Sequence, residues 1–129
     1  MASPNFADSI LDGGLTALAA ATRVDVCTTE PTTYGQATTT GTYSVANYTL
    51  TAGTGNGDWL IADDTSGRKC TLLQQSGSNG TATGAGNFLA FTNGTDTLYG
   101  VVDADGDTVN SGSPVTISEV DVWSIADPT

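Results

Sequence analysis

Apolar and polar positions divide the chain into one N-terminal helix followed by a series of short strands. Large apolar side chains recur near the N-terminus at spacings of three and four, the period of an amphipathic helix: Phe6, Ile10, Leu11, Leu15 and Leu18. Ser3 can cap such a helix and Pro4 suits its first turn. The pattern predicts a helix over about residues 4–20, with residues 1–6 as an N-terminal arm.

Two adjacent glycines lie inside this predicted helix. Gly13 and Gly14 each cost about 1 kcal/mol relative to alanine in a helix interior. The simpler interpretation is a helix that needs a packing partner to persist. The alternative is that the glycines let another backbone come close.

After the helix, apolar runs alternate with turns. The runs predict strands at residues 23–28, 43–50, 58–63, 69–75, 87–92, 97–102 and 113–125. Residues 59–62 are continuously apolar, which is typical of a strand buried on both faces, whereas residues 76–86 indicate a long flexible loop. In residues 113–125 the alternation slips near Ser118-Glu119, which predicts a bulge or a strand that passes between two partners. The spacing predicts one mainly β domain over residues 1–129, an antiparallel β-sandwich or barrel-like fold with one short helix.

Charge and composition exclude several functions. The 129 residues include 14 acidic and 3 basic ones, for a formal net charge of -11. Binding to nucleic acid or to an anionic membrane needs Lys and Arg, so neither partner is expected. The chain has no histidine, which removes the commonest general base and metal ligand. We therefore expect no enzyme and no cofactor.

The two cysteines, Cys27 and Cys70, could form one disulfide. In a cytosolic setting buried free thiols are the favoured alternative. The N-terminal segment has neither a basic flank nor an apolar core, so no secretory signal is expected. No run approaches the ~20 apolar residues of a membrane span.

One acidic stretch resembles a metal-binding loop. Asp103, Asp105 and Asp107 match the first three ligands of an EF-hand, but the glycine is displaced and the closing glutamate is absent. The dipeptides Asp105-Gly106 and Asn93-Gly94 are strong hairpin signals. We favour a solvent-facing hairpin, with a weak calcium site at the three carboxylates as the alternative.

Two further groups of residues can be interpreted either as ordinary structural residues or as functional ones. For Asp63-Asp64, which precede "TSG", we favour a solvated turn over a pair of acid-base carboxylates. A glycosidase that uses this region is disfavoured, because no second, separated carboxylate can be placed opposite it from the sequence. Trp59 and Trp123 could stack on a sugar, although core packing is the more common role of such aromatics.

The order of segments carries a resemblance. The helix is followed by an apolar strand that reaches Cys27, then by the loop "EPTTY". Further matching segments are Trp59 to Ala62, Cys70 to Leu73, and a Ser/Thr-rich final strand from Val115 to Pro128. In this order the chain resembles small structural proteins of tailed-phage virions, of the capsid decoration or cement type.

The resemblance implies a protein that binds the outer surface of a phage head and stabilises contacts between major capsid protein subunits. Its location would be the virion surface, after synthesis in the host cytoplasm, and sister copies in a trimer or other homo-oligomer are the further partners it implies. The residues predicted to contact these partners lie in the arm and in the loop after the first strand: Ser3, Pro4, Asn5, Phe6, Glu30, Pro31 and Tyr34. The alternative is a receptor- or carbohydrate-binding module of a tail fibre or tail tip, which would need an exposed tryptophan.

Overall fold

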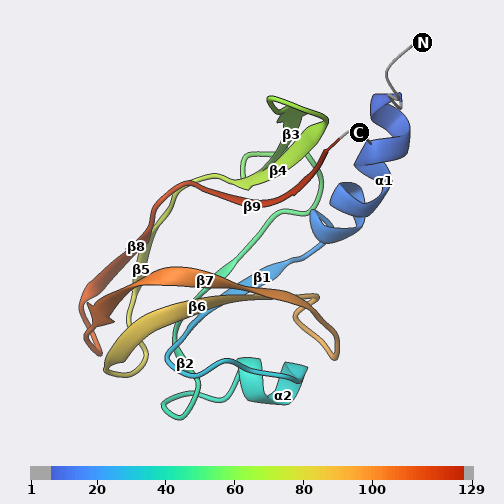
Figure 1. Cartoon of the computed structure of the whole chain (residues 1–129). Coiled ribbons are helices and arrows are strands. Elements are labelled where there is room, and N and C mark those ends of the chain that lie inside the picture. The colour runs from blue at the N-terminus through green and yellow to red at the C-terminus, as the bar shows by residue number, and fades with distance from the viewer. Residues whose placement is uncertain (1–6, 127–129) are drawn as a thin grey trace. The chain divides into compact units, whose positions relative to one another are not determined.

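The computed structural model describes residues 7–126, which form a mainly β structure with antiparallel sheets (Figure 1). The helices are α1 (Asp8–Leu18) and α2 (Tyr34–Ala37). The strands are β1 (Arg23–Cys27), β2 (Ser44–Thr49), β3 (Trp59–Asp63), β4 (Arg68–Leu72), β5 (Gln75–Asn79), β6 (Gly84–Thr92), β7 (Leu98–Val109), β8 (Pro114–Ile117) and β9 (Val120–Ile125). The predicted fold class, mainly β and antiparallel with one short N-terminal helix, is confirmed.

The described residues form two compact units, each built from separate stretches of sequence. Unit 1 comprises residues 7–20, 51–74 and 118–126, and unit 2 comprises residues 21–50 and 75–117. The prediction of a single domain over residues 1–129 stays a prediction, and the two units are described one at a time.

Unit 1 contains α1 and a three-stranded sheet in the order β3-β4-β9. In the β3–β4 ladder, Trp59 pairs with Leu72 and Ile61 with Cys70, so these four side chains share one face, and all are buried. α1 packs against this sheet, and its Leu11 and Leu15 are buried.

The opposite face of this sheet is partly exposed, in contrast to the prediction that residues 59–62 are buried on both faces. Leu60 alternates with Trp59 and Ile61 along β3 and is 43% exposed. The prediction of a strand buried on both faces is therefore wrong, because the core lies on the face to which Trp59 and Ile61 point.

Unit 2 contains a four-stranded sheet in the order β2-β1-β6-β7 and a two-stranded sheet of β5 and β8. β1 is central, with β2 on one side and β6 on the other, and four of its five residues are buried. Tyr48 of β2 connects the two sheets: its hydroxyl donates to the carbonyl of Val115 and accepts from the N–H of Ser78.

The Asn93-Gly94 hairpin is confirmed. β6 and β7 are antiparallel neighbours, and Gly94 has φ +74°. The Asn93 Oδ1 accepts hydrogen bonds from the N–H groups of Thr95, Asp96 and Thr97, at 2.9 to 3.0 Å. This asparagine side chain substitutes for backbone partners inside the turn.

The predicted hairpin at Asp105-Gly106 is wrong, because β7 runs through it without turning. Gly86 pairs with Asp107 and Phe88 with Asp103, so one residue of β6 faces three residues of β7. Gly106, at φ +78°, lies inside this bulge. The Asp-Gly signal thus marks a bulge within a long strand.

Two other connections were tested by the strand pairing. The predicted flexible loop at residues 76–86 is wrong, since β5 and the start of β6 fill most of it, where pairing with β8 and β7 supplies the ladders. At Ser118-Glu119 the last strand changes partner, as one of the two alternatives predicted: β8 pairs with β5, and β9 pairs with β4.

Candidate interaction surface

The predicted partner-contact residues fall into two groups. Ser3, Pro4, Asn5 and Phe6 lie outside the described residues. Of the other three, Glu30 is exposed, Pro31 is buried and Tyr34 is half-buried.

The segment that holds Tyr34 is an ordered turn of helix rather than a plain loop. Thr33 caps α2 by accepting a hydrogen bond from the N–H of Gln36 (3.1 Å). The Gln36 Oε1 in turn accepts from the N–H of Thr32 (2.8 Å). This reciprocal arrangement resembles a capping box, and it places Ala37 in a small core with Cys27 and Ala90.

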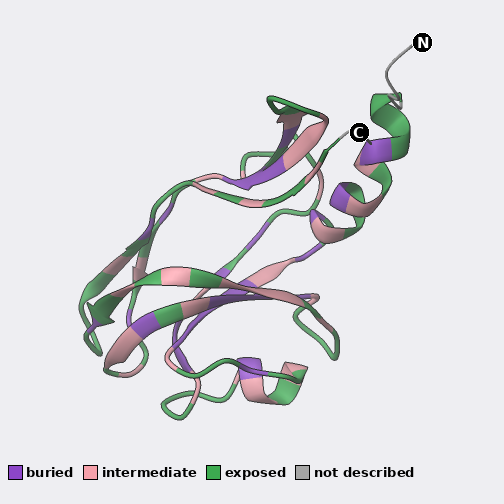
Figure 2. Ribbon diagram, viewed as in Figure 1, coloured by how far each residue is buried: buried purple, intermediate pink, exposed green. Residues whose placement is uncertain are grey.

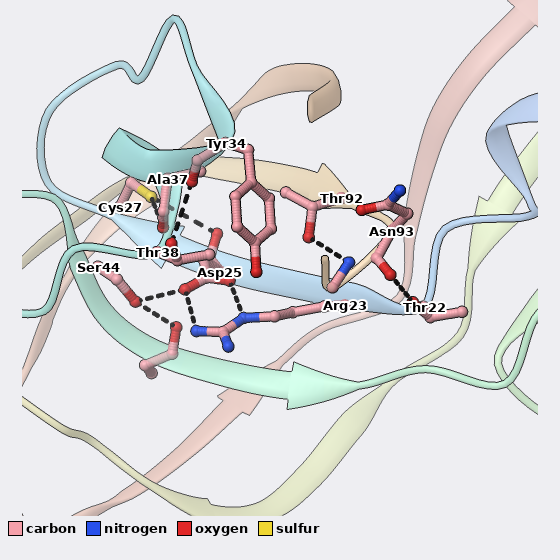
Figure 3. A network of polar contacts seen from close by, with 12 residues as sticks. Thr22, Arg23, Asp25, Cys27, Tyr34, Ala37, Thr38, Ser44, Thr92 and Asn93 are labelled. Carbon is pink, nitrogen blue, oxygen red and sulfur yellow. Dashed lines mark hydrogen bonds and ion pairs between the residues drawn. The ribbon is translucent and has the colours of Figure 1, made fainter. Parts of the chain in front are cut away.

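A buried ion pair lies in unit 2 beside this helix (Figure 3). The Asp25 carboxylate has no exposed surface and accepts hydrogen bonds from Arg23 Nε (2.6 Å), Arg23 Nη2 (3.0 Å) and Ser44 Oγ (2.7 Å). The hydrogen bond to Asp25 is the main reason that the pKa of Arg23 is raised. Figure 3 shows the ring of Tyr34 pointing from α2 toward this pair.

Sequence reasoning missed this pair because Val24 and Val26 define one face of β1 and suggest that Asp25 faces solvent. β1 is instead buried on both faces. The available signal was Arg23 two residues before Asp25, since residues i and i+2 lie on the same face of a strand. Because Asp25 and Ser44 are both fully buried, the pair serves the structure of unit 2 rather than a substrate.

The two thiols are free and buried. Burial raises the pKa of Cys27 to about 12 and that of Cys70 to about 11. A nucleophilic cysteine needs a thiolate near neutral pH. Neither residue meets that requirement.

Asp103, Asp105 and Asp107 occupy alternate, exposed positions along β7, the edge strand of its sheet. Within residues 7–126, no group of three or more His, Cys, Asp or Glu side chains could hold a metal ion. Figure 2 shows β7 as a strand of exposed and intermediate positions, with little buried surface. Charges on an edge strand oppose pairing with a further strand.

Among the described residues, the two large apolar side chains with the highest exposed fractions are both in unit 1. Ile10 of α1 is 67% exposed and Trp123 of β9 is 48% exposed, whereas Trp59 is completely buried. The interpretation as core residues is thus right for Trp59 and wrong for Trp123. Tyr99 of unit 2 is also exposed.

Every basic side chain of the protein is engaged in an ion pair. Arg68 contacts Asp12 (2.8 Å), Asp63 (2.9 Å) and Asp8 (3.5 Å). Lys69 contacts Asp121 (3.3 Å), and Arg23 contacts Asp25. The hydroxyl of Thr71 and, to a smaller extent, Lys69 lower the pKa of Asp121.

Comparison with known proteins gives no neighbour for this chain: no family model, curated protein or solved structure matches it significantly. Neither of the helices in residues 7–126 has the length and apolar character needed to cross a membrane.

Proposed function

We propose that this chain is a non-enzymatic capsid decoration, or cement, protein that binds the outer surface of a phage head. In this role it stabilises contacts between subunits of the major capsid protein. The proposal rests first on the order of segments that resembles small tailed-phage virion proteins. It is independent of any catalytic site.

The observation that best supports this role is the combination of strong negative charge with basic side chains that are all paired. The 14 acidic residues outnumber the 3 basic ones, and Arg23, Arg68 and Lys69 each contact a carboxylate. Contacts of all three basic side chains with carboxylates disfavour binding to the phosphates of packaged DNA. This charge suits a position outside the shell.

The proposed mechanism is many weak contacts made strong by repetition. A capsid presents the same site on every subunit, and linked or adjacent contacts can raise overall avidity by about 10² to 10⁴ over a single contact. Each molecule of this protein would add its contacts across neighbouring capsid subunits after synthesis in the host cytoplasm.

The test measures occupancy on purified mature heads of the parent phage. We expect the wild-type chain to bind heads and to be absent from purified tails. Deletion of residues 1–5 should reduce occupancy, because the arm is one predicted contact. Unchanged occupancy would eliminate the arm, whereas failure of the wild-type chain to bind heads would eliminate the decoration function itself.

A second candidate function is a receptor- or carbohydrate-binding module of a tail fibre or tail tip. The exposure of Trp123 favours it, since sugar-binding sites use exposed aromatic rings. Because Trp59 is fully buried, quenching of tryptophan fluorescence by added oligosaccharides would report on Trp123. Emission that does not respond to oligosaccharides would count against this alternative.

A further inference from the structure

An exposed apolar surface forms where α1 meets β9 in unit 1. We call it the Ile10–Trp123 patch; it consists of Ile10, Gly14, Trp123 and Ile125. Ile10 and Gly14 are four residues apart on α1 and therefore lie on the same side of the helix, one turn from each other. Trp123 lies against Gly14, which is one helical turn from Ile10.

Gly14 makes this arrangement possible. A Cβ atom at position 14 would lie 3.1 Å from Cη2 and 3.3 Å from Cζ3 of Trp123, and 3.4 Å from Cδ1 of Ile125. The missing side chain lets the indole lie close to the helix while 48% of the residue remains exposed. Gly14 thus lets an aromatic side chain come close to the helix, whereas the alternative drawn from the sequence had another backbone in that place.

The patch itself carries no charged or hydrogen-bonding side chain apart from the indole N–H. Recognition of a sugar requires polar groups placed around the aromatic ring. The nearest acidic group along β9, Asp121, is already engaged by Thr71 and Lys69. A protein surface, which offers apolar side chains, fits the patch better than a sugar does.

The charge of unit 1 indicates what surrounds the apolar contact on the partner. The described part of unit 1 contains seven acidic residues, Asp8, Asp12, Asp58, Asp63, Asp64, Glu119 and Asp121, and two basic ones, Arg68 and Lys69, both of which are ion-paired. A second copy of the chain, with the same net charge of -11, would be repelled. A partner surface with lysine and arginine residues is attracted.

We propose that the Ile10–Trp123 patch is the surface by which this chain docks on a protein that presents an apolar depression ringed by basic side chains. The inference rests on the proposed function, in which that protein is the major capsid protein. Ile10 and Trp123 are the apolar anchors, and the excess of acidic over basic residues in unit 1 attracts the basic side chains of the partner.

The experiment uses the full-length chain and purified heads of the parent phage from which the native protein has been removed. Ile10→Asp and Ile10→Lys both remove the apolar anchor at an exposed position that the fold does not need. We expect each to weaken binding by about tenfold or more, as truncation of an interface anchor does. Ile10→Lys should be the weaker binder of the two, because a basic rim repels lysine, and its deficit should shrink as salt is raised.

Leu60→Ser is the matched control, since Leu60 is a similarly exposed apolar residue of unit 1 on the other face of the sheet. It should bind like the wild-type chain. In the same titration, docking should protect Trp123 from acrylamide, whereas Trp59 is already shielded by burial. If both Ile10 variants bind heads as the wild-type chain does, the patch is not the docking surface, although the decoration function survives.

A second arm separates failure of the patch from failure of the proposed function. If the wild-type chain does not bind heads, the patch is tested with a synthetic amphipathic Leu/Lys helix, with an all-Lys peptide as the charge-only control. The Leu/Lys peptide should protect Trp123 from quenching, and Ile10→Lys should abolish that protection. The inference would be overturned if the all-Lys peptide, and not the Leu/Lys peptide, protected Trp123 from quenching. It would also be overturned if the Trp123 emission responded to oligosaccharides and not to the Leu/Lys peptide.

Discussion

Removal of either partner of the Arg23–Asp25 pair should destabilise unit 2, and the two removals should differ in size. Loss of one member of a buried ion pair costs about 3–5 kcal/mol, because the remaining charge is left without compensation. The Arg23 side chain is 29% exposed and can turn toward water, whereas that of Asp25 is completely buried. Asp25→Ala should therefore cost about 3 kcal/mol of unfolding free energy, and Arg23→Ala about 5 kcal/mol.

Two controls identify the charge as the cause. Ser44→Ala removes one hydrogen bond to the carboxylate, 2.7 Å long, and should cost about 2 kcal/mol. The double variant Arg23→Met/Asp25→Leu replaces the pair with apolar side chains and should lie within about 2 kcal/mol of the wild type, since an apolar pair of similar size often substitutes for a buried ion pair.

Urea unfolding monitored by far-ultraviolet circular dichroism is the suitable assay, because both tryptophans are in unit 1 and the ion pair is in unit 2. A larger loss for Asp25→Ala than for Arg23→Ala would contradict the greater burial of the Asp25 charge. A loss of less than about 1 kcal/mol for either single variant, the range of a surface ion pair, would contradict a buried pair.

Four other features lead to further expected outcomes: the two buried thiols, two glycines with positive φ, the carboxylates of β7 and the division into two units. Neither thiol should react with a disulfide reagent at pH 8 in the native protein, although both should react in urea, because burial raises both pKa values above the ordinary 9.0. As the pH rises from 9 toward 11, the unfolded chain releases thiol protons that the native state keeps. The unfolding free energy should therefore fall by up to about 1.4 kcal/mol per pH unit for each thiol. A Cys27→Ala/Cys70→Ala variant should lack this dependence on pH. Gly55 has φ +80° and open space around it, so Gly55→Ala should lower the unfolding free energy by about 1–2 kcal/mol. Gly67 has φ +79°, and its added Cβ would overlap the carbonyl oxygen of Ile125, so Gly67→Ala should cost at least roughly twice as much. Equal losses of unfolding free energy in urea would contradict the packing at Gly67. Millimolar calcium should not shift Tm in the wild type or in Asp105→Asn, and a calcium-dependent rise that Asp105→Asn abolishes would restore a metal site on β7. Circular dichroism and tryptophan fluorescence should report the same urea midpoint. The chain passes between the units after residues 20, 50, 74 and 117, so neither unit is a continuous stretch of sequence. Separate midpoints for the two signals would contradict a single cooperative domain.

Local sequence signals were reliable where neighbouring residues alone determine the structure. Leu11 and Leu15 belong to the predicted apolar stripe, and both are buried in α1. Asn93-Gly94 forms its hairpin because the Asn93 side chain satisfies three N–H groups within the same turn. The phase slip at Ser118-Glu119 predicted either a bulge or a strand that passes between two partners, and the strand pairing selects the second: β8 pairs with β5 and β9 with β4.

The errors arose where a distant strand decides the outcome. Asp105-Gly106 suits a two-residue turn, but β6 continues alongside it and converts the same dipeptide into a bulge. Residues 76–86 are rich in glycine and serine and have no intrinsic strand preference, so their strands depend on β7 and β8. The burial of Asp25 also depends on β2, because Ser44, its hydrogen-bond partner there, is 19 residues away in the sequence.

The edge strand β7 carries acidic side chains, whereas the Ile10–Trp123 patch is apolar, and this contrast bears on function. Asp103, Asp105 and Asp107 lie along β7, an edge strand that would otherwise offer unpaired backbone groups to another copy of the chain. No comparable charge lies on the Ile10–Trp123 patch, where an isoleucine that is 67% exposed has no structural need to be apolar. If self-association alone were being prevented, a polar residue at position 10 would be the expected choice. Carboxylates on an edge strand together with an apolar patch on unit 1 agree with the docking on a different protein that we propose above.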